Sequence, residues 1–489
     1  MSRRLLSILL AVGLICLPGG LAGMRLKGQA VTWADFNYVH HVSSSISHVY
    51  FATTGGLIRY NKVDQSWELP LTGADGMFDE QPRRVWVDWS DDHLFVETDF
   101  SLYEYDPTFD RWYPMAELPE IDNTVLHIQT PEDLLPSPQL DFVHDDRVTD
   151  SYSRAFAITD ILDDQTGNLW IGTWGFGAGQ ASSSARVMEQ LPYGLLQNHV
   201  QALHMDNSTL WVGGHMRHSY RTGLTLFYLD ENSFAYLESG VQPDFPATDV
   251  NCIEVVGDRV YIGTHDGLYV VDAETLTITN RYGRRQGLSD FEILSLEPVG
   301  DSLFVGTTHG IDLIEPGDSV RHLYPTQFAG QNIHDLERVD DYLWIASSIG
   351  AYRLLLKEAR LQKFDDPGNF LFGLAYNIER YNEMLWIATD VGVLGLNLET
   401  GATETFRESM RGYGRRALAV NDLIVAMASD RGLTIYFRAR KKQFSRTFTT
   451  DDGLASNRIL ALLLDGDYIW VGTDLGLTRF LWNNPDRID

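Results

Sequence analysis

One short phrase recurs along the chain and constrains the fold more than any other feature of the sequence. It consists of an apolar residue, an aromatic residue, a β-branched residue, a small residue and then Thr or Ser, as in Leu169–Thr173 and Ile469–Thr473. The second positions of its ten copies are residues 50, 95, 170, 211, 261, 304, 344, 386, 426 and 470. Eight of the nine intervals between them are 40 to 50 residues long. That period is typical of a repeat fold whose unit is a small antiparallel sheet.

The surroundings of the phrase are repeated as well. A short apolar run precedes it, as in Ile459–Leu463, and a third apolar run opened by Gly follows it, as in Gly476–Phe480. A fourth run usually ends in an aromatic residue, and turn residues separate all four. We therefore predict an all-β protein, a β-propeller of four-stranded antiparallel blades with about ten repeats. The small residue of the phrase would let the adjacent blade approach closely, and the following Gly would supply a positive φ.

The two ends of the repeat region suggest how the propeller closes. The tenth copy has only three strand-like runs, whereas an unassigned run, Ala30–Trp33, precedes the first copy. We expect this N-terminal strand to complete the last blade and so to hide an exposed sheet edge. This favours one closed ring. Ten blades exceed the usual four to eight, so two rings remain the alternative.

The first 23 residues have the pattern of a secretory signal peptide. Arg3 and Arg4 precede an apolar core from Leu5 to Leu17, which is too short to span a bilayer. We expect residues 1–23 to be removed and residues 24–489 to form the propeller, in the periplasm or outside the cell, without membrane insertion. Cys16 would suggest a lipoprotein, but the small residue expected just before such a cysteine is missing.

Composition excludes several classes of protein. The net charge is −29, with 67 acidic residues against 38 Lys and Arg, which disfavours nucleic acid as a partner. A hydrophobic content of 44% argues against disorder. After signal cleavage Cys252 is the single cysteine, so neither an intramolecular disulfide nor a thiolate metal cluster is expected.

The best copies of the repeat, Asp163 to Thr173 and Asp465 to Phe480, resemble the two-component-regulator type of β-propeller repeat. The resemblance covers almost the whole mature chain. It implies the propeller fold and an exported protein. No kinase or DNA-binding segment follows the repeats in this sequence, so we expect a stand-alone propeller. Because the repeated residues serve packing and turns, the resemblance says little about function.

Two irregularities interrupt the period. The interval between the second and third copies is 75 residues, and its excess, about Pro114 to Ser151, holds five prolines and nine acidic residues. We expect a solvated excursion on the rim; a flap over the central channel or a partner-docking element is the alternative. The second irregularity is the long loop after the phrase in the third and fourth copies, 174–179 and 215–221.

These loops and the connections between blades predict a ligand-binding face rich in arginine, histidine and aromatic residues. Arginine suits carboxylate or sulfate recognition, and aromatic faces suit sugar rings. The alternative is that each arginine pairs with a local acid. The candidate residues are Trp174, Phe176, His215, Arg217, His218, Tyr220, Arg221, Arg284, Arg285, Arg411, Arg415 and Arg416.

Known catalytic motifs are missing from the sequence, and no catalytic residue, metal ligand or cofactor is predicted. His40 and His41 lie on the first inner strand, and we expect the histidine that faces the channel to be hydrogen-bonded structure. The function predicted is a non-catalytic binding module for a ligand or a protein partner on the loop face, with acidic carbohydrate as a candidate ligand. The alternative is a carbohydrate-active lyase or hydrolase with its site at the channel mouth.

Overall fold

The computed structural model describes residues 29–76, 81–89, 92–108, 111–121, 126–127, 147–182, 188–215, 221–242, 244–246, 248–365, 373–407, 418–429, 431–438 and 444–484. The predicted signal peptide lies outside these residues. Ten antiparallel sheets make up nearly all of the described chain, and each copy of the repeated phrase lies in the second strand of a sheet. The predicted fold class, a β-propeller of four-stranded blades, is therefore confirmed.

We number the blades 1 to 10 in chain order. Blade 1 contains β2 (Val39–Ser44), β3 (His48–Thr53), β4 (Gly56–Asn61) and β5 (Ser66–Trp67). Blade 2 contains β6 (Arg84–Val87), β7 (Leu94–Glu97), β8 (Leu102–Asp106) and β9 (Arg111–Met115). Blade 3 contains β12 (Ala155–Asp163), β13 (Asn168–Trp174), β14 (Ala178–Ser182) and β15 (Met188–Leu191), joined by β10 (Leu126–His127) and β11 (Arg147–Thr149).

Blade 4 contains β16 (His199–Asp206), β17 (Thr209–His215), β18 (Gly223–Tyr228) and β19 (Ser233–Glu238). Blade 5 contains β20 (Val250–Val256), β21 (Arg259–Thr264), β22 (Gly267–Asp272) and β23 (Ile278–Tyr282). Blade 6 contains β24 (Ile293–Val299), β25 (Ser302–Thr307), β26 (Gly310–Glu315) and β27 (Ser319–Leu323), followed by the helix α1 (Pro325–Phe328). Blade 7 contains β28 (Ile333–Val339), β29 (Tyr342–Ser347), β30 (Gly350–Leu355) and β31 (Arg360–Lys363).

Blade 8 contains β32 (Ala375–Tyr381), β33 (Met384–Thr389), β34 (Gly392–Asn397) and β35 (Thr403–Arg407). Blade 9 contains β36 (Leu418–Val420), β37 (Ile424–Ser429), β38 (Gly432–Phe437) and β39 (Phe444–Phe448). Blade 10 contains β40 (Ile459–Asp465), β41 (Tyr468–Thr473) and β42 (Leu477–Leu481), and its fourth strand is β1 (Ala30–Trp33). The N-terminal strand thus completes the last blade, as expected.

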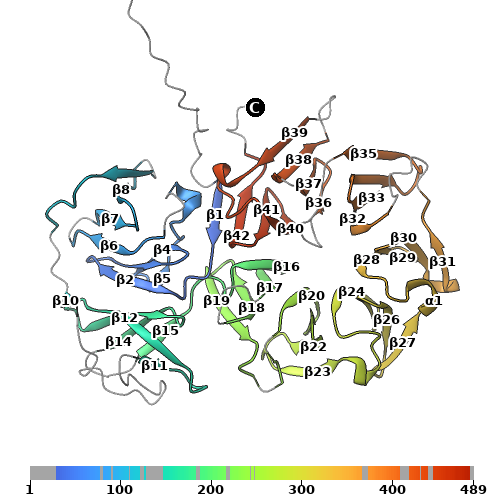
Figure 1. Cartoon of the computed structure of the whole chain (residues 1–489), viewed down its shortest axis with the longest axis horizontal. Coiled ribbons are helices and arrows are strands. Elements are labelled where there is room, and N and C mark those ends of the chain that lie inside the picture. The colour runs from blue at the N-terminus through green and yellow to red at the C-terminus, as the bar shows by residue number, and fades with distance from the viewer. Residues whose placement is uncertain are drawn as a thin grey trace, which may run out of the picture.

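Blades 4 to 10 form a closed ring (Figure 1). Within it, the inner strand of each blade packs on the inner strand of the next, and β16 of blade 4 packs on β40 and β41 of blade 10. The small residue of the phrase marks these junctions. A Cβ placed on Gly263 would lie 2.8 Å from Ile293 in the next blade, and one on Gly472 would lie 2.8 Å from Val200 across the closure. The ring therefore contains seven blades, so the expectation of one ring of all ten was wrong.

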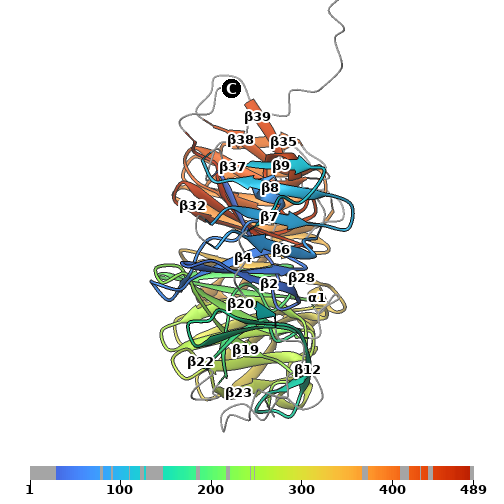
Figure 2. The same cartoon turned by 90° about the vertical axis from the view of Figure 1, so that its left-hand side faces the viewer.

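Blades 1 to 3 form a separate arc beside the ring. The strands β2 and β3 of blade 1 pack on β6 of blade 2, and β12 and β13 of blade 3 pack on β2 of blade 1. A Cβ on Gly172 would lie 2.6 Å from Val39, which places blade 3 before blade 1 and not after blade 2. Figure 2, seen from the arc, shows its blades one above another in a single flat layer with the ring. The chain thus leaves the ring after β1, builds the arc, and returns to the ring at β16.

The two parts are joined by a shared core and by two crossing segments. Tyr193, in the segment between β15 and β16, is buried, and its ring lies 4.7 Å from that of Trp67 in blade 1 and 5.1 Å from that of Phe234 in blade 4. The backbone N–H of Leu195 donates to the carbonyl of Ala34 at 2.9 Å, so the entry and exit of the arc lie side by side. This packing fixes the arc against the ring.

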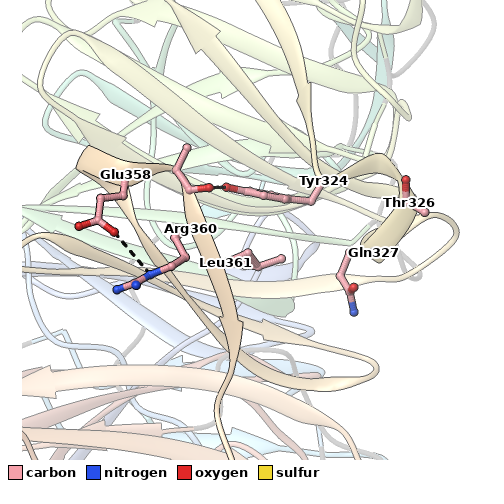
Figure 3. Close-up of a pocket in the computed structure, with 7 residues that line it drawn as sticks. Tyr324, Thr326, Gln327, Glu358, Arg360 and Leu361 are labelled. Atoms are coloured by element: carbon pink, nitrogen blue, oxygen red, sulfur yellow. Dashed lines mark hydrogen bonds and ion pairs between the residues drawn. The ribbon is translucent and has the colours of Figure 1, made fainter.

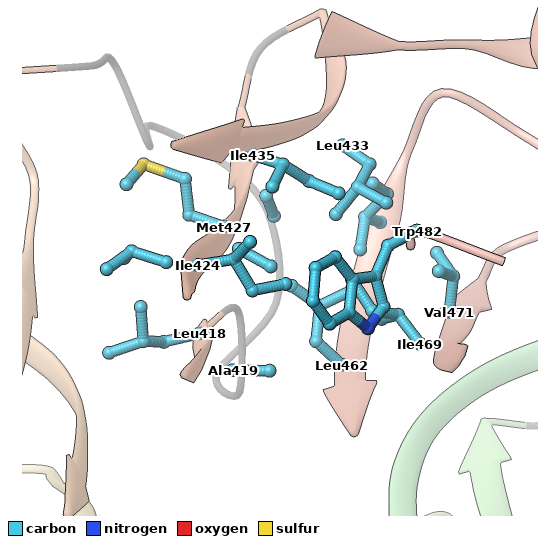
Figure 4. Packing of buried hydrophobic residues seen from close by; sticks show 14 of the residues in the cluster. Leu418, Ala419, Ile424, Met427, Leu433, Ile435, Leu462, Ile469, Val471 and Trp482 are labelled. Carbon is cyan, nitrogen blue, oxygen red and sulfur yellow. The ribbon is translucent and has the colours of Figure 1, made fainter. Parts of the chain in front are cut away.

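The residues of the phrase do the packing that the sequence predicts. The tryptophans at its second position are all buried: Trp170, Trp211, Trp344, Trp386 and Trp470. The Gly that opens the third strand has a positive φ, 126° at Gly267 and 145° at Gly476. Figure 4 shows the apolar contact between blades 9 and 10, where Ile435 and Leu433 lie near Ile469 and Trp482. Such interfaces repeat around the ring and hold the inner strands in place.

Candidate functional site

The inner strand of blade 3 differs from those of the ring blades because a further strand covers each end of its free edge. In β10, Leu126 and His127 pair with Asp163 and Leu162 of β12, and β11 pairs with the opposite end of β12. In the ring, each inner strand lies at the end of its sheet. Both added strands come from the proline-rich excess of 114–151, so this insertion contributes to the inner face of the arc.

This pairing brings together two histidines and an aspartate from three strands. His127 Nδ1 lies 2.9 Å from Asp160 Oδ1, and His41 Nε2 lies 3.9 Å from Asp160 Oδ2. The two imidazole rings are 5.0 Å apart. The backbone N–H of Val42 donates to Asp160 Oδ2 at 2.8 Å and orients the carboxylate. We call His41, His127 and Asp160 the His–His–Asp cluster.

The three groups have different protonation behaviour. Burial lowers the pKa of His41 to about 4, so its imidazole is neutral at physiological pH. The hydrogen bond to Asp160 raises the pKa of His127. For Asp160, burial opposes ionisation, but the bond from His127 and the charges of both histidines lower its pKa nonetheless. The cluster therefore presents one neutral imidazole next to an imidazole–carboxylate pair.

A second group of side chains lies next to this cluster, and we call it the Trp174 patch. It consists of Trp174, Tyr38, His40, Arg83 and Asp99. The indole of Trp174 is 40% exposed, and its ring lies 5.2 Å from those of both Tyr38 and His40. Arg83 donates to both carboxylate oxygens of Asp99, at 2.8 and 3.0 Å, and its Nη1 lies 3.0 Å from His40 Nε2. The patch thus combines an exposed aromatic ring with a hydrogen-bonded row of polar side chains, Asp99, Arg83 and His40.

Two of the predicted ligand residues are buried, which corrects the sequence-based expectation. Arg221 is 6% exposed; its guanidinium bonds Glu238 at 3.0 Å and Asn37 Oδ1 at 3.3 Å. Asn37 lies in the segment that enters the arc, and Glu238 lies in blade 4, so Arg221 links arc and ring. Phe176 is also buried, with its ring 5.1 Å from that of Phe156. Neither side chain is therefore available on the surface.

The other predicted residues lie elsewhere. His215 ends β17 with its ring stacked on His199 at 4.9 Å. Arg284 and Arg285 lie on an exposed turn of the ring, and Arg284 pairs at 2.8 Å with Asp290, as the alternative of local pairing predicted. Six candidates fall outside the described residues: Arg217, His218, Tyr220, Arg411, Arg415 and Arg416. The predicted face is therefore divided between the arc, represented by Trp174, and the ring, represented by Arg284 and Arg285.

Four carboxyl side chains and one histidine occupy equivalent positions on inner strands of the ring. The residue paired with the second position of the phrase is His204, Glu254, Glu297, Glu337 and Glu379 in five consecutive blades. Burial, together with the charges of Glu379 and Glu297, raises the pKa of Glu337 to about 10. In blades 9 and 10 the same position holds Ala419 and Leu463, so the series is interrupted. Burial first, and then the neighbouring like charges, thus favour the neutral carboxyl of Glu337.

An open groove of about 680 Å³ lies on the rim of blades 6 and 7, far along the chain from the predicted residues (Figure 3). Tyr324, Gln327, Glu358 and Arg360 line it. The hydroxyl of Tyr324 donates to the carbonyl of Ala359 at 2.5 Å, and Arg360 pairs with Glu358 at 3.6 Å. Tyr324 and Arg360 thus bond to other residues that line the groove.

Sequence reasoning missed two members of the His–His–Asp cluster. Asp160 stands in an apolar run, and its polarity within that run was the available signal. His127 lies in the insertion, where no period indicates which strand it meets. The sequence placed both His40 and His41 on the first inner strand, and both lie in β2, with His41 beside the carboxylate of Asp160.

No protein-family model and no curated protein matches the chain. Among solved structures, PorZ, a bacterial surface component of the type-IX secretion system of Porphyromonas gingivalis, is similar, with a TM-score of 0.58 and 12% identity over 93% of this chain and 87% of that chain. The extracellular domain of a hybrid two-component system from B. thetaiotaomicron has a TM-score of 0.48 and 14% identity over 92% of this chain and 70% of that chain.

Among the helices that the structure describes, we find none with the length and apolar character needed to cross a membrane. The similarity to PorZ extends over both the arc and the ring, because it covers 93% of the chain. At 12% identity it shows a shared fold and not a shared activity. The chain is a β-propeller protein built from repeated four-stranded blades.

Proposed function

We propose that the protein is a non-catalytic binding module of the exported type that takes a carbohydrate ligand on the Trp174 patch. The observation that supports this proposal is the exposure of Trp174, whose indole is 40% accessible although two rings hold it in place. A rigid aromatic face beside polar groups of fixed orientation is what a sugar-binding surface needs, because little freedom is lost on binding. The signal-like N-terminus supports export.

The polar groups of the patch point to the acidic class of carbohydrate. Arg83 already binds Asp99 through two hydrogen bonds. A uronate carboxylate would exchange with Asp99 for the same bidentate donor and would contact His40 on its other side. The protein as a whole is acidic, so capture of an anionic chain depends on a guanidinium that it can reach at short range.

The test compares polygalacturonate with a neutral glucan in binding to the purified chain. Trp174→Ala should abolish binding of polygalacturonate, and Arg83→Gln should reduce the preference for it over the glucan. Phe100→Ala is the matched control, because Phe100 is a second exposed aromatic of the arc, at 85% exposure, and should leave binding unchanged. Equal binding by the wild type and the Trp174 variant would refute the proposal.

The second candidate is a carbohydrate-active lyase or hydrolase acting within the ring. The observation that favours it is the raised pKa of Glu337 beside the carboxyls of Glu297 and Glu379, since two carboxyls with different pKa values can supply a general acid and a base. Incubation with polygalacturonate distinguishes the two. New unsaturated ends absorbing in the ultraviolet, or new reducing ends lost in Glu337→Gln, would establish the enzyme, and binding without turnover would support the module.

A further inference from the structure

We propose that His41, His127 and Asp160 form a binding site for one divalent transition-metal ion, with Zn²⁺ as the reference ion. Each residue offers one ligand atom, and these three atoms lie within 4.8 Å of one another. Only the described residues contribute to the site. This inference does not depend on the carbohydrate proposal, because Trp174 and Arg83 take no part in it.

The ligand set selects the class of metal. Two imidazole nitrogens and one carboxylate oxygen are the donors of many three-residue Zn²⁺ sites and also suit Cu²⁺, Ni²⁺ and Fe²⁺. Ca²⁺ and Mg²⁺ prefer sites made of oxygen alone. Three protein ligands leave a coordination position free for water or for a bound molecule. The cluster is therefore suited to a borderline transition metal with an open position.

The geometry needs a limited adjustment. Ligand atoms of a tetrahedral site with metal–ligand bonds of about 2.1 Å stand about 3.4 Å apart, so the present separations must shorten. His127 can move most easily, since its side chain is exposed and it ends a strand of two residues. Asp160 is already held by the N–H of Val42, which would remain as an outer-shell bond to the metal-bound carboxylate.

His41 is the ligand that must give up a hydrogen bond when the metal ion binds. The N–H of Val85 points at its Nδ1 at 3.5 Å, the upper limit of a hydrogen bond. Binding through Nε2 requires a proton on Nδ1 and gives up this weak contact, whereas rotation of the ring presents Nδ1 to the metal instead. Either change exchanges one long hydrogen bond for a metal–nitrogen bond, which is much stronger.

A junction of the same kind joins two blades of the ring without any histidine. It therefore shows which side chains are needed to pack the blades together. In blades 7 and 8, Asp335 accepts the N–H of Ile378 at 2.9 Å and the amide of Asn377 at 2.8 Å. Asn377 occupies the position of His41, because each pairs with the small residue of its blade's phrase. An aspartate and an amide are thus sufficient to join two blades. The histidine at 41 and the added histidine from the insertion serve some further purpose, and metal binding uses both.

The experiment measures Zn²⁺ binding to the full chain by isothermal titration calorimetry, together with the visible spectrum of the Co²⁺ form. We expect one ion per chain and the intense bands of a low-coordinate Co²⁺ site. His127→Ala and His41→Asn should each lower Zn²⁺ affinity by roughly 100-fold or more, since even outer-shell changes cost 10–100-fold. His41→Asn reproduces the residue that the ring uses, so folding is preserved and its melting curve verifies this.

The matched control is His309→Gln. His309 is an exposed histidine paired with Asp290 in the ring, outside the cluster, and its loss should leave Zn²⁺ affinity unchanged. Binding that is weak, has no fixed stoichiometry, or is unaffected by His127→Ala would overturn the proposal and would assign the ion to the acidic surface. Equal losses of Zn²⁺ affinity in His127→Ala, His41→Asn and His309→Gln would also overturn the proposal.

Discussion

Asp160 of blade 3 and Asp335 of blade 7 occupy the same position in their blades, and each carboxylate accepts a backbone N–H from the inner strand of the neighbouring blade, at 2.8 and 2.9 Å. Each stands opposite the small residue of the phrase, Gly172 in one blade and Ala346 in the other. The arc and the ring therefore share one way of joining blades. The difference between them lies in the side chains that surround the carboxylate.

The first prediction concerns the tryptophans of the phrase. Trp386 is fully buried and lies against Phe406, so Trp386→Ala should lower the free energy of unfolding by about 3–5 kcal/mol through lost packing and a cavity. Reversible denaturant unfolding measures this. The exposed Trp174 is the control, and its replacement by Ala should cost less than about 1 kcal/mol. Similar losses in both variants would contradict the assigned burial.

The second prediction concerns closure of the ring by β1, which pairs with β42 from Ala30↔Phe480 to Trp33↔Leu477. A chain that begins at Ala34 should lose hydrogen-exchange protection in β40, β41 and β42, because its last blade has an open edge and lacks the packing of Trp33. A chain that begins at Gly28 is the control and should keep full protection. If both chains protect blade 10 equally, the strand does not close the ring.

The third prediction concerns Arg221, which the sequence suggested as a surface ligand residue. Because it is buried and bonds both Glu238 and Asn37, Arg221→Ala should reduce the free energy of unfolding by about 2–4 kcal/mol. Glu238 keeps a second partner in Arg154, which limits the loss. Arg285→Ala, on an exposed turn, should change stability by no more than about 0.5 kcal/mol. A negligible effect of Arg221→Ala would return this residue to the ligand-binding candidates.

The fourth prediction concerns pH. Burial and neighbouring carboxylates raise the pKa of Glu337 from its ordinary value of 4.5 to about 10. Between these values the unfolded chain releases this proton and the folded chain keeps it, so the residue costs stability increasingly as pH rises. Glu337→Gln should therefore match the wild type near pH 4 and exceed it by more than about 1 kcal/mol at pH 8.

Thermal unfolding across this pH range measures the effect. Glu399→Gln, a change at an exposed acid of blade 8, should leave the difference from wild type independent of pH. A Glu337 variant that follows the wild-type pH profile would mean that the carboxyl is ionised in the folded protein.

Much of the local structure was predictable because the responsible residues are neighbours in the chain. The positions of Trp386 and Trp470 and the positive φ of Gly267 followed from repeat spacing and turn chemistry. The closing role of Ala30–Trp33 is a long-range pairing, and it was predictable because the tenth repeat lacks one strand. Trp174 is exposed, but it ends strand β13 and does not lie in the loop where the sequence placed it. Arg221 and Phe176 were misplaced, since the direction of a long loop depends on what it meets after folding.

The sequence by itself determined the blades: their strands, their turns, their buried aromatic residues and their number. These properties follow from contacts within a segment of 40 to 50 residues, which the repeat displays directly. Only the tertiary structure decided that seven blades close into a ring while three form an arc, and that His127 meets His41 and Asp160. The physical reason is that every blade presents much the same small residue and apolar face, so the phrase favours packing on a neighbour without specifying which one. That choice depends on long-range contacts, such as those of Trp33 with Phe227 and Trp470, between residues that lie far apart in the chain.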